Sequence, residues 1–241
     1  MGMPVTVEIV DDSARRSDLE EVLHYFSYID GKFSTYKEES EISRINRGEI
    51  REESYSGDMK EILELSDKTA VETDGYFDIT APDGKIDPSG IVKGWAIYGA
   101  AKILEEKGFK NFYVDAGGDV QVNGRNSRGE KWSIGIKNPL KQDEIVKVIY
   151  ADREGVATSG LYIRGRHIYN PKDFKDELEE VISLTVIGPN IYEADRFATA
   201  AFAMGRRGIE FVEKLDGFEG YSIDKKGIST MTSGFSRYAH A

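Results

Sequence analysis

Residues 194–199, A-D-R-F-A-T, carry a carboxylate and a hydroxyl group four positions apart. On a helix this spacing brings Asp195 and Thr199 to one face. Both side chains offer hard oxygen ligands, and Mg²⁺ in proteins is typically held by one or two carboxylates with a few neutral oxygens. The alternative interpretation is structural, because an acid near a helix N-terminus complements the helix dipole and a threonine can bond back to its own helix. From this pair alone, the structural interpretation is the simpler one.

Residues 87–94, D-P-S-G-I-V-K-G, predict a Gly-rich turn that enters a helix. Backbone N–H groups and Lys93 could bind an anionic group there, although the spacing is not that of a Walker loop. A tight turn followed by a helix start is the structural alternative.

Residues 115–119, D-A-G-G-D, follow an apolar strand, and their paired glycines permit either the close approach of a ligand or neighbouring chain, or a β-bulge.

Residues 158–160 and 166–171 form a further polar group, which contains His167 just before a proline turn. His167 is the histidine with polar, potentially functional neighbours, although a histidine at a strand end is more often structural than catalytic. His24 is expected on a helix beside the apolar stripe, as a packing or surface residue. The three histidines lie too far apart in the sequence for a zinc motif such as H-E-x-x-H.

Composition excludes several classes of protein. The chain has 241 residues, of which 39% are hydrophobic and 31% charged, as in a globular protein rather than a fibre or a tail. No apolar run approaches the roughly 18 residues of a membrane span. The formal charge of −11 disfavours a nucleic-acid partner. Because cysteine is absent, disulfides, thiolate metal sites, a cysteine nucleophile and a cysteine lipid anchor are all excluded.

The opening residues, M-G-M-P-V-T-V-E-I-V, alternate apolar and polar side chains as a strand does. They lack the basic region and the apolar region of a signal peptide. The protein is therefore expected in the cytoplasm as the sequence stands, or in the periplasm or at the cell surface if a signal segment has been removed.

The elements that must position these groups are predicted from periodicity and from turn residues. Residues 58–73 predict an amphipathic helix closed by Asp74-Gly75, after which Y-F-D-I-T (76–80) reads as a short strand and 81–90 as a loop. Further helices are expected at 15–28, after an N-cap at Ser40, at 91–107 up to Gly108, at 194–205 and at 207–217. Strands are expected at 6–10, 111–124, 131–137, 144–151, 155–169 and 181–188, with a closing hairpin at 220–230.

Helices interleave with strands, but most connections between strands have a hairpin-like form. We therefore predict an α+β fold, a mixed sheet with packed helices, rather than a doubly wound parallel sheet. The sequence contains no internal repeat, low-complexity tract or linker. This indicates a single compact domain over residues 1–241, of one or two lobes.

Six motifs follow one another in a specific order. They are S-T-Y-x-x-x-S-E-I-S-R-I-N (34–46), F-D-I-T (77–80), I-D-x-x-G-I-x-K-G (86–94), D-A-G-G-D-V (115–120), A-T-S-G (157–160) with H-I-x-x-P (167–171), and A-D-x-x-A-T-A (194–200). Together they resemble the ApbE family of FAD:protein FMN transferases, once described as thiamine-biosynthesis lipoproteins. The resemblance extends from about residue 1 to about residue 205, and it implies an ApbE-like fold.

The resemblance also implies a chemistry. Members of the family use Mg²⁺ to split the pyrophosphate of FAD and pass FMN to a Ser or Thr of a target flavoprotein, releasing AMP. The implied metal ligands are Asp195, Thr199 and Gly90, the last through its carbonyl oxygen. His167 and Asp195 are the expected catalytic residues, since an imidazole with a pKa near 6.5 can accept the proton of the incoming hydroxyl; Asp119 is the reserve candidate for this base. The implied FAD-binding residues are Met1, Tyr36, Tyr76, Phe77, Asp78, Asp87, Lys93, Tyr169 and Ala198.

Two features depart from the family pattern. The turn after His167 reads N-P-K-D-F (170–174) where the family usually has D-P-x-T-G, and only A-P-D-G-K (81–85) intervenes where several tens of residues are usual. A shortened lobe would leave FAD in a more open cleft, in which water competes with the acceptor hydroxyl. The alternatives to a transferase are therefore an FAD pyrophosphatase and a non-catalytic FAD-binding protein. The chain has no D-x-x-[ST]-x-T acceptor run of its own, so the acceptor is expected to be a separate protein.

Overall fold

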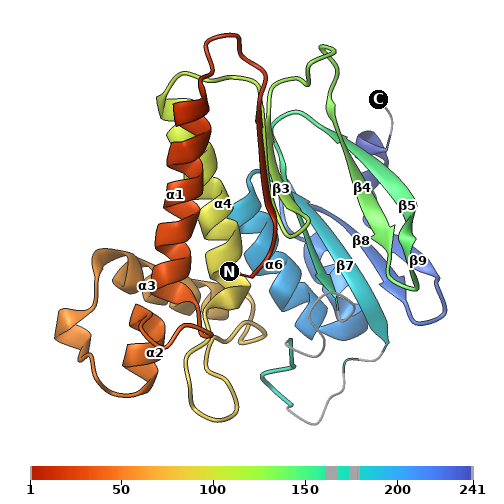
Figure 1. The fold of residues 1–241 in the computed structure, drawn as a ribbon. Helices are drawn as coiled ribbons and strands as arrows, with labels where there is room; N and C mark the ends of the chain where they lie inside the picture. Colours follow the sequence, from red (N-terminus) through yellow and green to blue (C-terminus); the bar gives the residue numbers. More distant parts are fainter. Residues whose placement is uncertain (1, 161–167, 174–177, 179, 240–241) are drawn as a thin grey trace.

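The structure is a computed structural model that describes residues 2–160, 168–173, 178 and 180–239. In this part of the chain a layer of helices packs on one face of an antiparallel sheet, and a two-stranded ribbon lies over the other face (Figure 1). The helices are α1 (Arg16–Phe33), α2 (Glu41–Asn46), α3 (Gly57–Glu72), α4 (Ser89–Glu106), α6 (Ile191–Ala203) and α7 (Gly208–Glu213), with 3₁₀ turns at Glu52–Ser54, Gly205–Arg207 and Phe235–Tyr238.

The described sheet has seven strands in the order β1-β2-β3-β6-β7-β8-β9, and the ribbon is made of β4 and β5. Every neighbouring pair of described strands is antiparallel, including the pairs whose strands are connected through helices. The predicted α+β class is confirmed, with an antiparallel rather than a mixed sheet in the described part. The strands are β1 (Val5–Ile9), β2 (Phe112–Ala116), β3 (Asp119–Asn123), β4 (Trp132–Asn138), β5 (Lys141–Ala151), β6 (Gly155–Gly160), β7 (Val181–Gly188), β8 (Glu219–Asp224) and β9 (Ser229–Met231).

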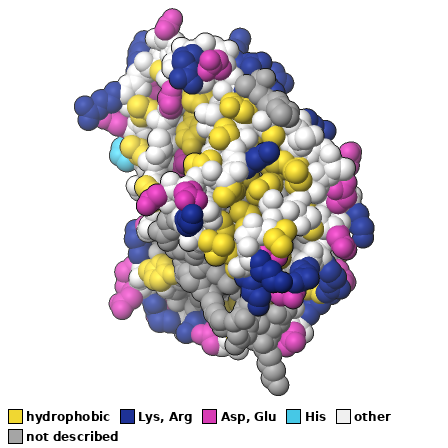
Figure 2. Space-filling view, turned by 90° about the vertical axis from the view of Figure 1, so that its right-hand side faces the viewer, with side chains coloured by type: hydrophobic (Ala, Val, Ile, Leu, Met, Phe, Trp, Pro, Cys, Tyr) yellow, Lys and Arg dark blue, Asp and Glu magenta, His cyan; other side chains and the backbone are white. Residues whose placement is uncertain are grey.

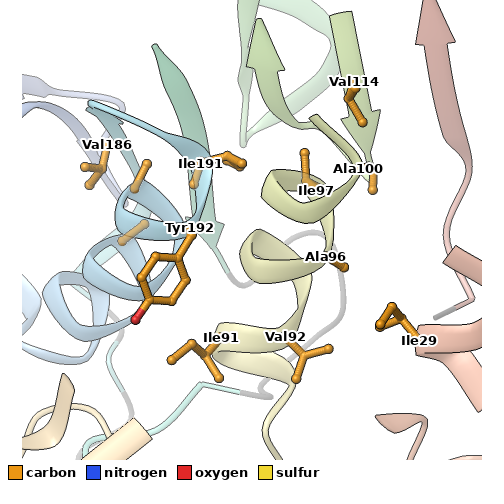
Figure 3. Packing of buried hydrophobic residues seen from close by; sticks show 14 of the residues in the cluster. Ile29, Ile91, Val92, Ala96, Ile97, Ala100, Val114, Val186, Ile191 and Tyr192 are labelled. Carbon is orange, nitrogen blue, oxygen red and sulfur yellow. The ribbon is translucent and has the colours of Figure 1, made fainter. Parts of the chain in front are cut away.

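Helix α4 lies at the centre of the core between the helices and the sheet. Its residues Ile91, Val92 and Ile97 are buried between Ile29 of α1 and Ile191 of α6 (Figure 3). A helix enclosed in this way is apolar on most of its surface rather than along one stripe. In the described residues, no helix combines the length and the apolar character that crossing a membrane requires.

A second core lies between the sheet and the ribbon. Val122 of β3 packs there with Trp132 and Ile134 of β4 and Ile149 of β5. The buried positions of β4 alternate with exposed ones, as the two-residue period of a strand demands. One face of the ribbon is therefore committed to this core, and the other faces outward.

Side-chain caps and glycines set the ends of the helices close to where the sequence indicates. Ser40 Oγ accepts the N–H of Ser43 at 3.2 Å, and Asn190 Oδ1 accepts the N–H of Glu193 at 2.9 Å at the start of α6. Each bond satisfies a donor in the first turn that has no partner within the helix. Helix α4 ends before Gly108, whose φ of +88° is easily adopted only by glycine. The predicted N-cap and the predicted stop are both confirmed.

The prediction of a strand at residues 76–80 is wrong. The segment makes only an isolated bridge between Thr80 and Ile86. Asp78 Oδ1 accepts the N–H of Thr80 at 2.7 Å, and such a local side-chain bond competes with the hydrogen bonds of a strand ladder.

The glycine pair after β2 forms a turn rather than a β-bulge. Gly117 and Gly118 have φ values of +67° and +96° and connect β2 to β3 as a two-residue hairpin loop. A Cβ at Gly117 would lie 3.0 Å from Met3 Sδ. Gly117 therefore permits the close approach of another segment of the same chain.

The sheet opens between β3 and β6. These two strands share only the pairs Val120–Val156 and Gln121–Gly155. Beyond these pairs, Asp119 Oδ1 accepts the N–H of Thr158 at 2.9 Å. A side-chain oxygen therefore stands in place of a backbone carbonyl of the ladder. The gap places a carboxylate and the end of β6 at the wall of a cavity.

Gly155 fixes the contact between β6 and the start of α6. A Cβ there would lie 2.0 Å from the backbone nitrogen of Ile191. We expect Gly155→Ala to lower the free energy of unfolding by about 1–3 kcal/mol, because the backbone of α6 would have to move. Gly31→Ala on α1, where nothing lies within 4 Å of the new Cβ, should raise it by about 0.5–1 kcal/mol. Urea denaturation measures both, and equal effects would contradict the close contact.

Candidate active site

A cavity of about 1260 Å³ lies where β3 and β6 separate. It is bordered by the start of α4, by α6, by the β2–β3 turn, by β4 and β6, and by the loop that joins α3 to α4. Small-molecule sites usually measure roughly 300–1,000 Å³. The cavity therefore has room for an extended ligand.

Lys93 joins two buried aspartates at the floor of the cavity. Its Nζ forms a close ion pair with Asp119 Oδ2 and lies 3.3 Å from Asp195 Oδ1. Both aspartates are only 1% exposed. The three residues come from three different elements, α4, β3 and α6, so the cluster exists only when these elements are packed together.

Gly94 lets α4 and α6 approach each other at this point. Its backbone N–H donates to Asp195 Oδ2 at 2.7 Å. A Cβ at Gly94 would lie 2.5 Å from Asp195 Cβ and 2.8 Å from the carbonyl oxygen of Ile191. Only glycine fits here, and its N–H fixes one oxygen of Asp195 while Lys93 faces the other.

Burial raises the pKa of Asp195 from its ordinary value of 3.8 to about 7. Lys93 lowers this pKa, Asp119 raises it, and the N–H of Gly94 lowers it. The raised value follows because one ammonium group cannot compensate both the burial and the neighbouring carboxylate. A further cation beside the cluster would favour the ionised form of Asp195.

Oxygens suited to a hard cation meet beside this cluster. Thr199 Oγ1 donates to the carbonyl oxygen of Gly90 at 3.3 Å, and Asp195 lies one helical turn earlier on α6. All three residues line the cavity. A Cβ at Gly90 would lie 3.1 Å from Thr199 Cγ2, so glycine keeps the hydroxyl and the carbonyl close together.

The residues present fit a divalent cation of the Mg²⁺ type. A carboxylate, a hydroxyl and a peptide carbonyl are the donors that Mg²⁺ accepts, usually with substrate phosphates completing its shell. Among the described residues, no three His, Asp or Glu side chains gather as a metal site by themselves. When Asp195 is ionised, two carboxylates against one lysine leave the buried cluster with excess negative charge, which favours a bound cation.

Aromatic and acidic side chains form one wall of the cavity. Tyr76, Phe77 and Asp78 line it from the loop after α3, and Asp87 lines it just before α4. Phe77 is 2% exposed, and its ring edge would lie 3.4 Å from a Cβ at Gly90. This wall thus continues directly from the oxygen cluster.

Tyr169 lines the cavity from a different part of the chain. Its Oη donates to the carbonyl oxygen of Thr80 at 2.9 Å. Burial raises the pKa of Tyr169 to about 12, and nearby carboxylates, with Asp78 the strongest, raise it as well. The hydroxyl therefore remains a donor at neutral pH and ties residues 168–171 to the loop.

The structure brings most of the predicted site residues to one cavity and leaves two elsewhere. Tyr36 is 93% exposed and borders a separate hollow of about 50 Å³, which it shares with Lys93. Ala198 is fully buried in the first core, so its contact with a flavin nucleotide stays a prediction. Met1 and His167 lie outside the described residues. The predicted residues that line the cavity are Tyr76, Phe77, Asp78, Asp87, Gly90, Lys93, Tyr169, Asp195 and Thr199.

Two contributions were missed by sequence reasoning. Gly94 falls inside the predicted helix 91–107 and was given no role, although a glycine inside a helical pattern is a signal of close packing. Asp119 was considered only as a reserve base, and the structure adds its ion pair with Lys93 and its bond from Thr158. No sequence spacing links Asp119 to Lys93, because the two residues lie on different elements.

The ApbE family model matches residues 1–83 and 80–222. The chain belongs to the ApbE family. The two matched stretches meet at residues 80–83, beside the short loop 81–85 that departs from the family pattern. The expected family is thereby confirmed.

Curated relatives carry one name. The protein from Escherichia coli K12, an FAD:protein FMN transferase, is 28% identical over 166 residues, which cover 65% of this chain and 47% of the relative. The FAD:protein FMN transferase of Haemophilus influenzae is 24% identical over 282 residues, covering 89% of this chain and 82% of the relative. The chain thus spans about half the length of the first of these relatives.

Solved structures agree in fold. The flavin transferase ApbE from Vibrio cholerae superposes with a TM-score of 0.86 at 22% identity, covering 99% of this chain and 96% of the other. The ApbE protein from Thermotoga maritima superposes with a TM-score of 0.87 at 24% identity, covering 100% and 97%. These likenesses show an ApbE-like architecture.

The raised pKa of Asp195 predicts how the stability of the metal-free protein depends on pH. Between about pH 4 and about pH 7 the folded chain keeps a proton on Asp195 that the unfolded chain releases. This residue therefore lowers the free energy of unfolding as the pH rises through that window. Asp195→Asn removes the effect, so the variant should lose less stability than the parent protein. Urea denaturation in EDTA at several pH values measures both slopes, and equal slopes would contradict the raised pKa.

Proposed function

We propose that this protein transfers FMN from FAD to a Ser or Thr hydroxyl of a separate flavoprotein, in a Mg²⁺-dependent reaction that releases AMP. The proposal rests on the buried cluster of Lys93, Asp119 and Asp195, which lies beside Gly90 and Thr199 in a cavity large enough for a dinucleotide. Membership of the ApbE family, whose curated relatives are named FAD:protein FMN transferase, supplies the class of substrate.

Phosphoryl transfer depends mainly on positioning and on neutralising charge. Lys93 has its ammonium group at the cavity floor, 3.3 Å from Asp195 Oδ1, where a pyrophosphate would meet a positive charge. Gly94 and Asp119 hold Asp195 and Lys93 in these positions. Mg²⁺, when held by Asp195, Thr199 and the carbonyl of Gly90, would supply further charge neutralisation to phosphate oxygens.

The reaction requires a base for the incoming hydroxyl. The acceptor oxygen bonds to the phosphorus of the FMN half, the bond from that phosphorus to the bridging oxygen breaks, and AMP leaves with that oxygen. Asp119 is a poor base for the released proton, because its oxygens face the ammonium of Lys93 and the N–H of Thr158. We therefore assign the base to His167, as the resemblance to the family implies.

The aromatic wall suits the flavin end of the substrate. Tyr76, Phe77 and Tyr169 border the cavity beside the cation ligands, and flat aromatic rings prefer stacked or edge-on contacts with one another. We propose that they contact the isoalloxazine ring, while Asp87 at the start of α4 contacts the nucleotide. The roles of Tyr36, Ala198 and Met1 remain those that the family resemblance implies.

A second function, hydrolysis of FAD to FMN and AMP, is favoured by one observation. The loop 81–85 is closed by the bridge between Thr80 and Ile86, and Ala81 and Pro82 border the cavity directly. No longer segment is inserted at this point to cover the cavity. Water would then compete with the acceptor hydroxyl for the same phosphorus atom.

Removal of the Asp195 carboxylate tests the proposed metal site. We expect Asp195→Ala to reduce covalent FMN attachment at least about 100-fold, because the carboxylate that would bind the cation directly is lost. Asp67→Ala, at an exposed position of α3, is the matched control and should retain full activity. Flavin fluorescence and the mass of the acceptor measure attachment, and circular dichroism verifies the fold. Full activity of Asp195→Ala would refute the metal assignment.

An AMP assay separates the transferase from the hydrolase. Purified protein is incubated with FAD and Mg²⁺, with and without a flavoprotein fragment that carries an acceptor threonine, and with EDTA as the control. The transferase predicts AMP only when the fragment is present, together with covalent FMN on it. AMP without the fragment would assign the hydrolase, and AMP in neither sample would leave a flavin-binding protein.

A further inference from the structure

Large apolar side chains are exposed on two neighbouring hairpins, the β4–β5 ribbon and the β8–β9 hairpin. Figure 2 views the molecule from the side that carries these strands and shows hydrophobic side chains gathered across it. Contiguous apolar surface of this kind marks interaction sites on proteins. We call the set the hairpin patch; it consists of Leu140, Ile145, Val146, Val148, Ile228 and Met231, which are 37–61% exposed.

The two hairpins lie close to each other at their tips. A Cβ at Gly227, in the β8–β9 turn, would lie 3.5 Å from Leu140 Cδ1, in the β4–β5 turn. Ile228 follows directly in the chain and is 61% exposed. The apolar side chains of the two hairpins therefore form one surface rather than two separate ones.

The outward face of the ribbon is apolar although the inward face already supplies the second core. Val148 is exposed opposite Gly135, which has no side chain to cover it. The register shifts at the next pairs, from Ile136–Lys147 to Lys137–Ile145, and leaves Val146 as the extra residue of a β-bulge. The bulge exposes two successive apolar residues, Ile145 and Val146, where a regular strand would expose only one of them.

The hairpin patch is continuous with the candidate active site. Ile145 belongs to the patch and also lines the cavity, together with Gly135 and Lys137 of the same ribbon. A protein that delivers a hydroxyl group to the floor near Lys93 must cover the mouth of the cavity. The ribbon lines the cavity, and the hairpin patch is the apolar surface that adjoins it.

The charge around the hairpin patch favours a partner with an acidic surface. Residues 137–148 and 224–231 carry five lysines and three acidic residues, whereas the whole chain has a net charge of −11. These two segments are therefore locally basic on an acidic protein. A partner segment with acidic residues close to the acceptor hydroxyl complements them.

We propose that the hairpin patch is the docking surface for the folded acceptor flavoprotein, which covers it with an apolar surface around an acidic segment that carries the Ser or Thr. This inference rests on the proposed FMN transfer. It adds that recognition extends beyond the acceptor run to a folded surface.

The test compares two acceptors, a folded flavoprotein domain that contains a D-x-x-[ST]-x-T run and a short synthetic peptide of the same run. Val148→Glu and Ile228→Glu each introduce a charge into the patch, at positions that do not line the cavity. We expect each to raise KM for the folded domain at least about tenfold, because the charge must be desolvated on docking. The kcat for the domain and both constants for the peptide should stay unchanged. Val71→Glu, at an 82% exposed valine on α3, should match the parent protein throughout.

The other outcomes overturn the proposal in distinguishable ways. If the parent protein modifies the domain and the patch variants do so with an unchanged KM, the docking surface is wrong and the proposed function stands. If sedimentation shows that the variants dissociate a dimer without changing KM, the patch joins two copies of this chain. If the peptide reaction is impaired to the same degree, the substitutions act on the cavity instead. If the parent protein modifies neither acceptor, the proposed function fails, and the docking surface with it.

Discussion

The ion pairs of Lys93 with Asp119 and Asp195 are the constraint on which the rest of the structure depends. Taking three charged groups out of water is costly unless they remain within contact distance of one another. The contact holds only while α4, β3 and α6 keep their mutual positions. Several close approaches between elements meet this requirement, such as the one at Gly94 between α4 and α6 and the one at Gly155 beneath the start of α6. Gln121 of β3 contributes another, because its Oε1 accepts the N–H of Ile191 at the first turn of α6.

The cavity owes its existence to the incomplete pairing of β3 and β6. A continuous ladder would bring the backbones of the two strands together and leave no room between them. Here the ladder stops after two residue pairs, and Asp119 satisfies the N–H of Thr158 that would otherwise have no partner from β3. The same carboxylate then binds Lys93 through its other oxygen. The Asp119 side chain thus binds both the end of β6 and Lys93 at the floor of the cavity.

The two departures from the family pattern meet at the aromatic wall of the cavity. The short loop 81–85 and the turn at residues 168–173 are tied together by the bond from Tyr169 Oη to the carbonyl of Thr80. Lys172, in the altered turn, lies 2.6 Å from Asp74 Oδ2 and 4.4 Å from the ring centre of Tyr76. The turn therefore packs against the wall despite its changed sequence. The cavity keeps an aromatic side close to the cation ligands, and Ile145 of the exposed ribbon also lines it.

The sequence by itself determined the features that depend on near neighbours in the chain. The cap at Ser40, the stop at Gly108 and the shared face of Asp195 and Thr199 follow from helical geometry and from local hydrogen bonds. The order of the motifs was sufficient to indicate the family. The tertiary structure alone decided that Asp119 pairs with Lys93, that residues 76–80 bridge a loop instead of forming a strand, and that Ala198 lies in the core. These outcomes depend on which distant elements pack together, and neither local periodicity nor spacing along the chain carries that information.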